Sequence, residues 1–269
     1  MVTRLDAAYD AQVLAVRAKV ESYAQRLWNG LPSYRDADAE RLIAALVPRV
    51  EAGQARVAQL TDAYVSRLAA VETGGAILRG DVADSSTLAL RGVSSDEVYN
   101  RPFVTLYTNL SNGSTLTAAV TAGGARLASL VSTGMQLSKT HSARNAMGRS
   151  GITTYERVLT GRENCALCVI ASTQRYHRGD LLPIHPGCDC GVRPGSGDPN
   201  QQIINADLLE RIHSAVEAEF GTSDRGARLL TGDNSVSDYL DLTVTHEHGE
   251  IGPVLAWRGQ HFSRGADIS

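Results

Sequence analysis

Apolar residues recur at steps of three and four along two long segments near the start of the chain. They are Leu5, Tyr9, Val13, Val16, Val20, Tyr23 and Leu27 in the first segment, and Ile43, Leu46, Val50, Val57, Leu60, Tyr64, Leu68 and Val71 in the second. Such a stripe is typical of helices that pack lengthwise on a partner. Pro32 ends the first helix, and Pro48 either kinks the second or begins a new one. We predict a helical hairpin over residues 1–80, with an oligomerisation or docking arm as the alternative.

The helical pattern continues through residues 81–150 after a connection rich in Gly, Ser and Asp. Ser94 and Glu97 have the spacing of a capping box, which marks the start of a helix. Apolar spacing then favours helix across Pro102–Leu110, from Leu116 to Val131, and more weakly across Ser138–Met147. The sequence predicts a helical region here, with a turn near Asn112.

After Gly151 the pattern changes to short β-like pieces, which we assign to a segment of residues 151–199. Residues 200–269 then predict one helix, Asn205–Phe220, followed by two short apolar runs that form a hairpin or edge strands. The sequence therefore predicts a mainly α fold with a small α+β C-terminal part.

Composition and charge narrow the classes of function. Aromatic residues make up only 5% of the chain, which suits closely packed helices, and the net charge is −3. Basic residues gather between Lys139 and Pro194, ahead of an acidic tail, and this permits a weak nucleic-acid contact without requiring one. The longest uncharged stretch, Pro102–Ala125, is too rich in Thr, Ser, Asn and Gly to cross a bilayer. With no apolar leader near the N-terminus, we expect a soluble protein made in a reducing compartment.

All four cysteines fall within one short stretch, which makes this stretch the main candidate for chemistry. A CxxC pair is followed, after sixteen residues, by His-Pro-Gly-Cys-Asp-Cys. Two thiols separated by two residues can grip one ion from a tight turn, and a second pair completes a tetrahedron, which suits Zn²⁺. The candidate ligands are Cys165, Cys168, His185, Cys188 and Cys190.

Five donors compete for four positions around the ion. We expect Cys165, Cys168 and His185 together with either Cys188 or Cys190, and four cysteines as the second choice. Disulfides would need an oxidising compartment, and a thioredoxin-like redox pair would need a βαβ unit. Cysteines without any shared role are the remaining alternative. Because donors are in surplus, the metal has no open position for water, so we expect a structural zinc ion and no catalytic residues.

The pattern CxxC followed by HPxCxC, ahead of an acidic helix, resembles the minor head proteins of tailed phages, the Mu F-like head-morphogenesis family. The likeness is sharpest from Tyr155 to Pro194. The ending from Glu247 to Phe262 is similar to that of such proteins in phages of actinobacteria. The resemblance implies a helical N-terminal part followed by a zinc-knuckle-containing Mu F-like domain.

The same resemblance implies a role and a place in the cell. Such a protein is a low-copy or oligomeric component of the phage head interior, present in the host cytoplasm during assembly. It acts with the portal protein and with the major capsid or scaffolding protein, in procapsid assembly or in DNA packaging and ejection. Some relatives carry an extra enzymatic domain. The ~75 residues after Pro194 are fewer than a domain usually needs, so we expect none here.

Two rival functions remain open. A zinc-stabilised DNA nuclease with an HNH-like finger would use residues such as Arg175, His177, Asp180, His185 and Asp189, but the sequence offers no clear second-metal set. A zinc-ribbon regulator would contact DNA through Lys139, Arg144 and Arg149, although such charges also fit a solvated helix face. The sequence does not assign nucleic-acid-binding residues, and Arg-Gly-Asp at 178–180 is most simply a loop.

Overall fold

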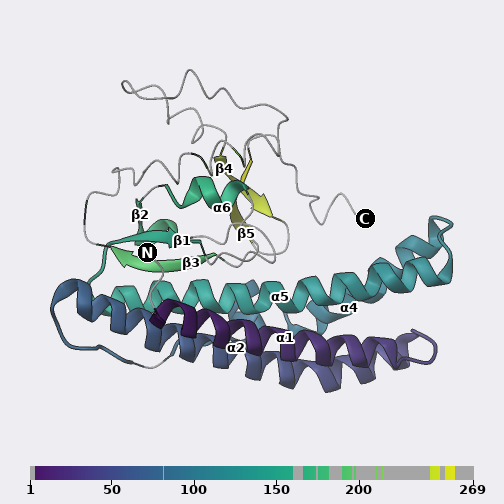
Figure 1. The fold of residues 1–269 in the computed structure, drawn as a ribbon. Helices are drawn as coiled ribbons and strands as arrows, with labels where there is room; N and C mark the ends of the chain where they lie inside the picture. Colours follow the sequence, from purple (N-terminus) through teal and green to yellow (C-terminus); the bar gives the residue numbers. More distant parts are fainter. Residues whose placement is uncertain are drawn as a thin grey trace. The chain divides into compact units, whose positions relative to one another are not determined.

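The computed structural model describes residues 4–80, 82–159, 166–173, 175–181, 190–195, 243–248 and 252–257, together with residues 197, 210 and 214. Within these residues the fold is mainly helical, which confirms the mainly α character expected from the sequence, and two small antiparallel sheets complete it (Figure 1). The chain divides into two compact units. The first comprises Thr3–Tyr64 and Asp81–Ala143, and the second comprises Val65–Gly80 and Arg144–Ser269.

Two long helices, α1 (Arg4–Asn29) and α2 (Asp36–Thr73), occupy the two segments with apolar stripes. Helix α2 runs through Pro48 without a break, so the alternative of a new helix beginning there is wrong. Proline removes a single backbone donor from a helix, whereas Leu46 and Val50 on either side are completely buried. Their burial keeps the helix continuous.

At two positions the apolar spacing predicts burial that the structure does not show. Val71 continues the predicted stripe, yet it is 77% exposed in the last turn of α2. In α1 the sequence favoured Leu27, but the structure buries Trp28, which is 1% exposed. The buried side of α1 is therefore rotated by one residue at its C-terminal end.

Three further helices follow, each ended by local features that the sequence encodes. They are α3 (Thr87–Arg91), α4 (Ser95–Ser111) and α5 (Leu116–Arg149). The Ser94 hydroxyl accepts a hydrogen bond from the Glu97 amide, which confirms the predicted start of α4. The turn expected near Asn112 separates α4 from α5. The weak pattern after Val131 belongs to the same continuous helix α5, which leads into a left-handed residue at Gly151.

The first unit contains a polar contact layer as well as an apolar core. Tyr9 and Tyr64 stack with ring centroids 4.1 Å apart. Their hydroxyls reach the opposite helix, since Tyr9 pairs with Thr61 at 2.8 Å and Tyr64 donates to Asp6 at 2.8 Å. Buried polar groups that are all hydrogen-bonded fix the register of two helices. These contacts set α1 against α2 along their shared length.

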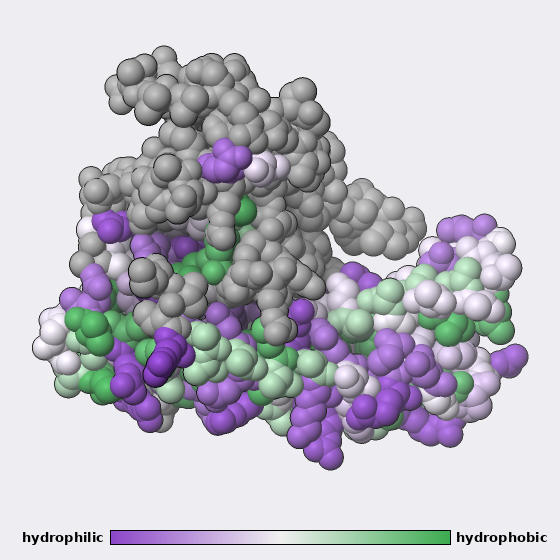
Figure 2. Space-filling view, viewed as in Figure 1, coloured by the Kyte–Doolittle hydropathy of each residue, from purple (hydrophilic) through white to green (hydrophobic). Residues whose placement is uncertain are grey.

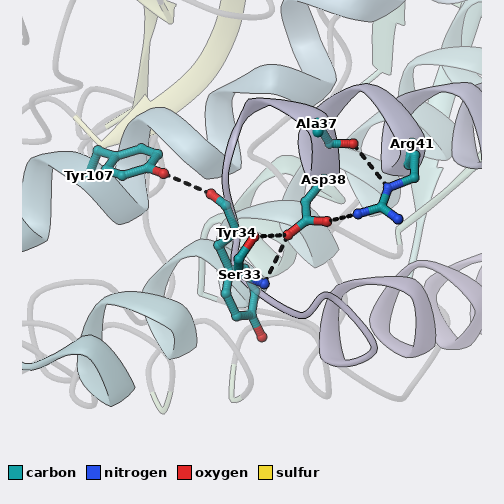
Figure 3. A network of polar contacts seen from close by, with 6 residues as sticks. All are labelled: Ser33, Tyr34, Ala37, Asp38, Arg41 and Tyr107. Carbon is teal, nitrogen blue, oxygen red and sulfur yellow. Dashed lines mark hydrogen bonds and ion pairs between the residues drawn. The ribbon is translucent and has the colours of Figure 1, made fainter.

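The loop between α1 and α2 is fixed by one carboxylate (Figure 3). Asp38 accepts hydrogen bonds from both the amide and the hydroxyl of Ser33, at 2.9 and 2.7 Å, and pairs with Arg41. Tyr34 adopts a left-handed conformation with φ of 56°, which is uncommon for a residue with a large side chain. Tyr107 from α4 donates a hydrogen bond to its carbonyl at 2.9 Å. The network holds a strained turn at the start of α2.

We expect Asp38→Asn to lower the melting temperature at pH 7. Hydrogen bonds from the Ser33 side chain and amide, helped by Arg41, hold the pKa of the Asp38 carboxyl below its usual range. A lowered folded-state pKa stabilises the fold above the unfolded pKa of about 4, and this stability is lost as the pH falls through the folded value. The difference between wild type and variant should therefore shrink below pH ~4 in thermal melts followed by circular dichroism. Asp36→Asn, in the same helix turn, is the matched control, and equal pH profiles for both variants would contradict this role.

In the second unit, three short strands form an antiparallel sheet in the order β2–β1–β3. They are β1 (Thr154–Val158), β2 (Arg175–His177) and β3 (Gly191–Gly195), with helix α6 (Ala166–Ala171) between β1 and β2 and the 3₁₀ turn η1 (Arg178–Asp180) after β2. Pro194 lies on the edge strand β3, where a missing amide donor is tolerated. The Arg-Gly-Asp tripeptide is this 3₁₀ turn.

The two apolar runs near the C-terminus form a β-hairpin, as predicted. Strand β4 (Thr243–His248) pairs antiparallel with β5 (Gly252–Trp257) in a register that places His248 opposite Gly252. The helix expected over residues 205–220 lies almost wholly outside the described residues.

The described surface mixes polar and apolar residues. Over the helices on the face shown in Figure 2, hydrophilic and hydrophobic residues alternate without one kind covering a whole element. Among the described helices, none combines the length and the hydropathy needed to span a bilayer.

Candidate metal centre

Two of the five predicted zinc ligands lie together in one buried cluster of the second unit. Cys168 is 0% exposed and Cys190 is 8% exposed, and they share this cluster with Leu167 and Ala171. Leu159 and Tyr176 pack against it. Two segments that are about twenty residues apart along the chain thus bring their thiols into the same small core.

The secondary structure explains how each thiol is positioned. Cys168 lies inside α6, so the tight turn expected for the CxxC pair is wrong at this residue. Cys190 directly precedes β3, whose first residue, Gly191, pairs with Val158 of β1. The sheet register therefore sets the place of Cys190.

A buried arginine faces the second thiol. Arg157 of β1 is 6% exposed, and its Nη1 donates a hydrogen bond to Cys190 Sγ at 3.5 Å. Its guanidinium also lies 5.9 Å from the ring centroids of both Tyr155 and Tyr176. A cation in a buried site is costly unless negative charge, aromatic faces or hydrogen bonds compensate it. Arg157 places positive charge where a thiolate would need it.

Tyr176 ties the sheet to α6. Its ring stacks on Tyr155 with centroids 5.2 Å apart, and its hydroxyl donates to the Ala171 carbonyl at 2.9 Å. Burial raises the pKa of the Tyr176 hydroxyl, Arg157 acts in the opposite direction, and Tyr155 and Cys190 add to the increase. The hydroxyl therefore stays protonated and keeps this bond at any physiological pH.

The other predicted ligands, Cys165, His185 and Cys188, lie outside the described residues. Within the described part of the chain, no three His, Cys, Asp or Glu side chains come together as a metal site. The described strands all pair antiparallel, so the βαβ context that a thioredoxin-like redox pair requires is not found in them. His177 is exposed at the end of β2.

The residues named for the nuclease alternative are only partly described. Arg175 and His177 belong to β2, and Asp180 closes η1. His185 and Asp189 lie outside the described residues. Nothing in the described part brings these residues to one reacting centre.

Sequence reasoning missed Arg157, Tyr155 and Tyr176. A signal was present, because side chains alternate along a strand and Tyr155, Arg157 and Leu159 fall on one face. A charged residue between two apolar ones on that face indicates a buried charge with a specific partner. The partner itself depends on the β1–β3 register, which a single sequence does not give.

Comparisons with known proteins add no relative. No protein-family model matches the chain, and neither a curated protein nor a solved structure is detectably similar to it.

Proposed function

We propose that the chain is a minor head protein of a tailed phage, acting in procapsid assembly or in DNA packaging and ejection, and that a structural zinc ion holds its C-terminal part. The observation that carries this proposal is the Cys/His signature of residues 165–190, which resembles that of the Mu F-like family, together with the burial of Cys168 and Cys190 in one cluster.

The described residues fit a structural zinc ion. A closed site needs four protein donors and exclusion of water, and both described thiols are buried. Three thiolates and one neutral imidazole around Zn²⁺ leave the site one charge negative, and the guanidinium of Arg157 beside Cys190 offsets that charge. The zinc ion would cross-link α6 to the start of strand β3. It would have a structural and not a catalytic role.

For the fourth position we propose Cys190. Its thiol shares the apolar cluster with Cys168, and it accepts a hydrogen bond from a buried donor. Donors of this kind orient metal ligands and tune their basicity. The proposed ligand set is therefore Cys165, Cys168, His185 and Cys190.

A zinc ion bound in this way would stabilise the short sheet of the second unit. The sheet β2–β1–β3 consists of strands of three to five residues, which bury little apolar surface. Such small β units are marginally stable by themselves and are often held by metals or disulfides. The long helices of the first unit would then provide surfaces for the portal, capsid or scaffolding protein.

The role in the head is tested by deleting the gene from the phage that encodes the chain. We expect fewer infectious particles and malformed or DNA-poor heads in electron micrographs, restored when the wild-type gene is supplied in trans. An unchanged titre with normal, DNA-filled heads would contradict the proposal. Metal-dependent DNA cleavage by the purified chain, lost in His185→Ala while the fold survives, would instead support the nuclease alternative.

A further inference from the structure

A cavity of about 360 Å³ lies in the second unit, between the end of α5 and the 3₁₀ turn η1. We call it the arginine pocket. Its described lining residues are Arg144, Asn145, Gly148, Arg149, Arg178 and Gly179. None of these six is acidic, and none is aromatic. Three positive charges and one amide therefore surround a space that has the size of a small-ligand site.

Hydrogen bonds to backbone carbonyls hold Arg144 and the turn that carries Arg178 beside this space. Arg144 donates to the carbonyl of Leu181, just after η1. The Arg178 amide donates to the Thr153 carbonyl at 2.8 Å, which anchors the turn beside β1. A Cβ added at Gly148 would clash with Arg178 Nη1, so this glycine lets the guanidinium approach the helix closely. The turn and the helix thus present their charges to one cavity.

Positive charge at this place exceeds what the helix end needs. Basic residues near a helix C-terminus are stabilising, because the end of the helix carries about half a negative charge. One arginine, such as Arg149 in the last turn, suffices for that effect. Three guanidinium groups, with no acidic residue among the described lining, favour a ligand with several negative oxygens.

We propose that the arginine pocket binds the phosphate group of a nucleotide, either free or within a DNA strand. Guanidinium groups match phosphate oxygens in a bidentate geometry, and Asn145 adds a neutral donor. Because the described lining has no aromatic side chain on which a base could stack, recognition is of the phosphate and not of the base. This inference goes beyond the role in the phage head and does not depend on it.

The test measures fluorescence anisotropy of a 3′-labelled oligothymidylate of about 12 nucleotides with the purified full chain at low salt. We expect binding that weakens as salt is added, and a loss of about tenfold or more in Arg178→Gln, equivalent to losing one charge-assisted hydrogen bond. Arg67→Gln is the matched control. It removes the same charge from an exposed residue of the same unit outside the pocket, and it should change affinity less than about twofold.

A second variant keeps the test valid if Arg178→Gln disturbs the turn η1. Asn145→Asp preserves the shape of the side chain and adds a negative charge at the pocket, so it should also weaken binding. Competition distinguishes the two sources of phosphate. Displacement by thymidine monophosphate or inorganic phosphate supports a free ligand, and displacement only by an unlabelled strand supports DNA. Equal weakening in Arg67→Gln and Arg178→Gln, or no binding of strand, nucleotide and phosphate, would overturn the proposal.

Discussion

Replacing Cys168 with serine is expected to release zinc from the chain and to unfold the sheet β2–β1–β3 while leaving the long helices intact. The wild type should carry about one zinc ion per chain, and the variant almost none. Structural zinc contributes ~10–16 kcal/mol of binding free energy in zinc-finger peptides, so its loss should destabilise the second unit by at least ~3 kcal/mol. Metal content after gel filtration and amide hydrogen exchange of residues 154–158 measure the two effects.

Serine at position 172 provides the matched control for this change. Ser172 follows α6, is 9% exposed, and donates a hydrogen bond to the Val169 carbonyl at 2.7 Å. Ser172→Ala should therefore cost about 1 kcal/mol and leave the zinc content unchanged. If Cys168 is only a buried apolar thiol, a chelator will not alter the wild type, and Cys168→Ala will be tolerated better than Cys168→Ser. These two results together would contradict the structural-zinc proposal.

Replacing Trp28 with alanine is expected to lower the free energy of unfolding of the first unit by about 3–5 kcal/mol. Trp28 is 1% exposed, and its indole donates to the Val120 carbonyl at 3.0 Å. Its ring centroid lies 5.0 Å from that of Phe103 and 5.1 Å from that of Tyr34. Removing the indole leaves a cavity where α1, α4 and α5 pack together. Urea unfolding followed by helical circular dichroism measures the loss.

A double-mutant cycle with Gly123 tests the same contact in the opposite direction. A Cβ at Gly123 would lie 2.5 Å from the Trp28 ring, so Gly123→Ala should destabilise the wild type. In the Trp28→Ala background the clash with the ring is removed and the close contact with the Pro102 carbonyl oxygen at 2.9 Å remains, so the cost of the added methyl group should fall but not vanish. Leu116→Ala, at a side chain that is 60% exposed, should change stability by less than ~0.5 kcal/mol. Additive effects of the two core changes would show that Trp28 and Gly123 do not share a contact.

Helices were predictable from the sequence because their signals are local. Three-four spacing and the Ser94 cap both act within a few residues, and both agree with the structure. Burial of Trp28 was not predictable by spacing, since it depends on Gly123 and Gly124 of α5, which admit its ring. The weak pattern after Val131 hides a continuous helix, because small and polar residues face partners there instead of large apolar ones.

Candidate sites were predictable only where the chemistry lies within one stretch of chain. The cysteine spacing predicted Cys168 and Cys190 as candidate zinc ligands, and the structure buries both in one cluster. The hydrogen bond from Arg157 and the arginine pocket join segments that are more than 25 residues apart along the chain. Such contacts depend on the sheet register and on where a helix ends, and pattern reading does not supply either.

The most direct test of the proposed role is quantitative mass spectrometry of purified procapsids and mature particles of the tailed phage to which we assign this chain. The tryptic peptide Leu42–Arg49, LIAALVPR, is measured against a peptide of the major shell protein. The account predicts a low and reproducible number of copies per head. Absence of the peptide from both kinds of particle would contradict it.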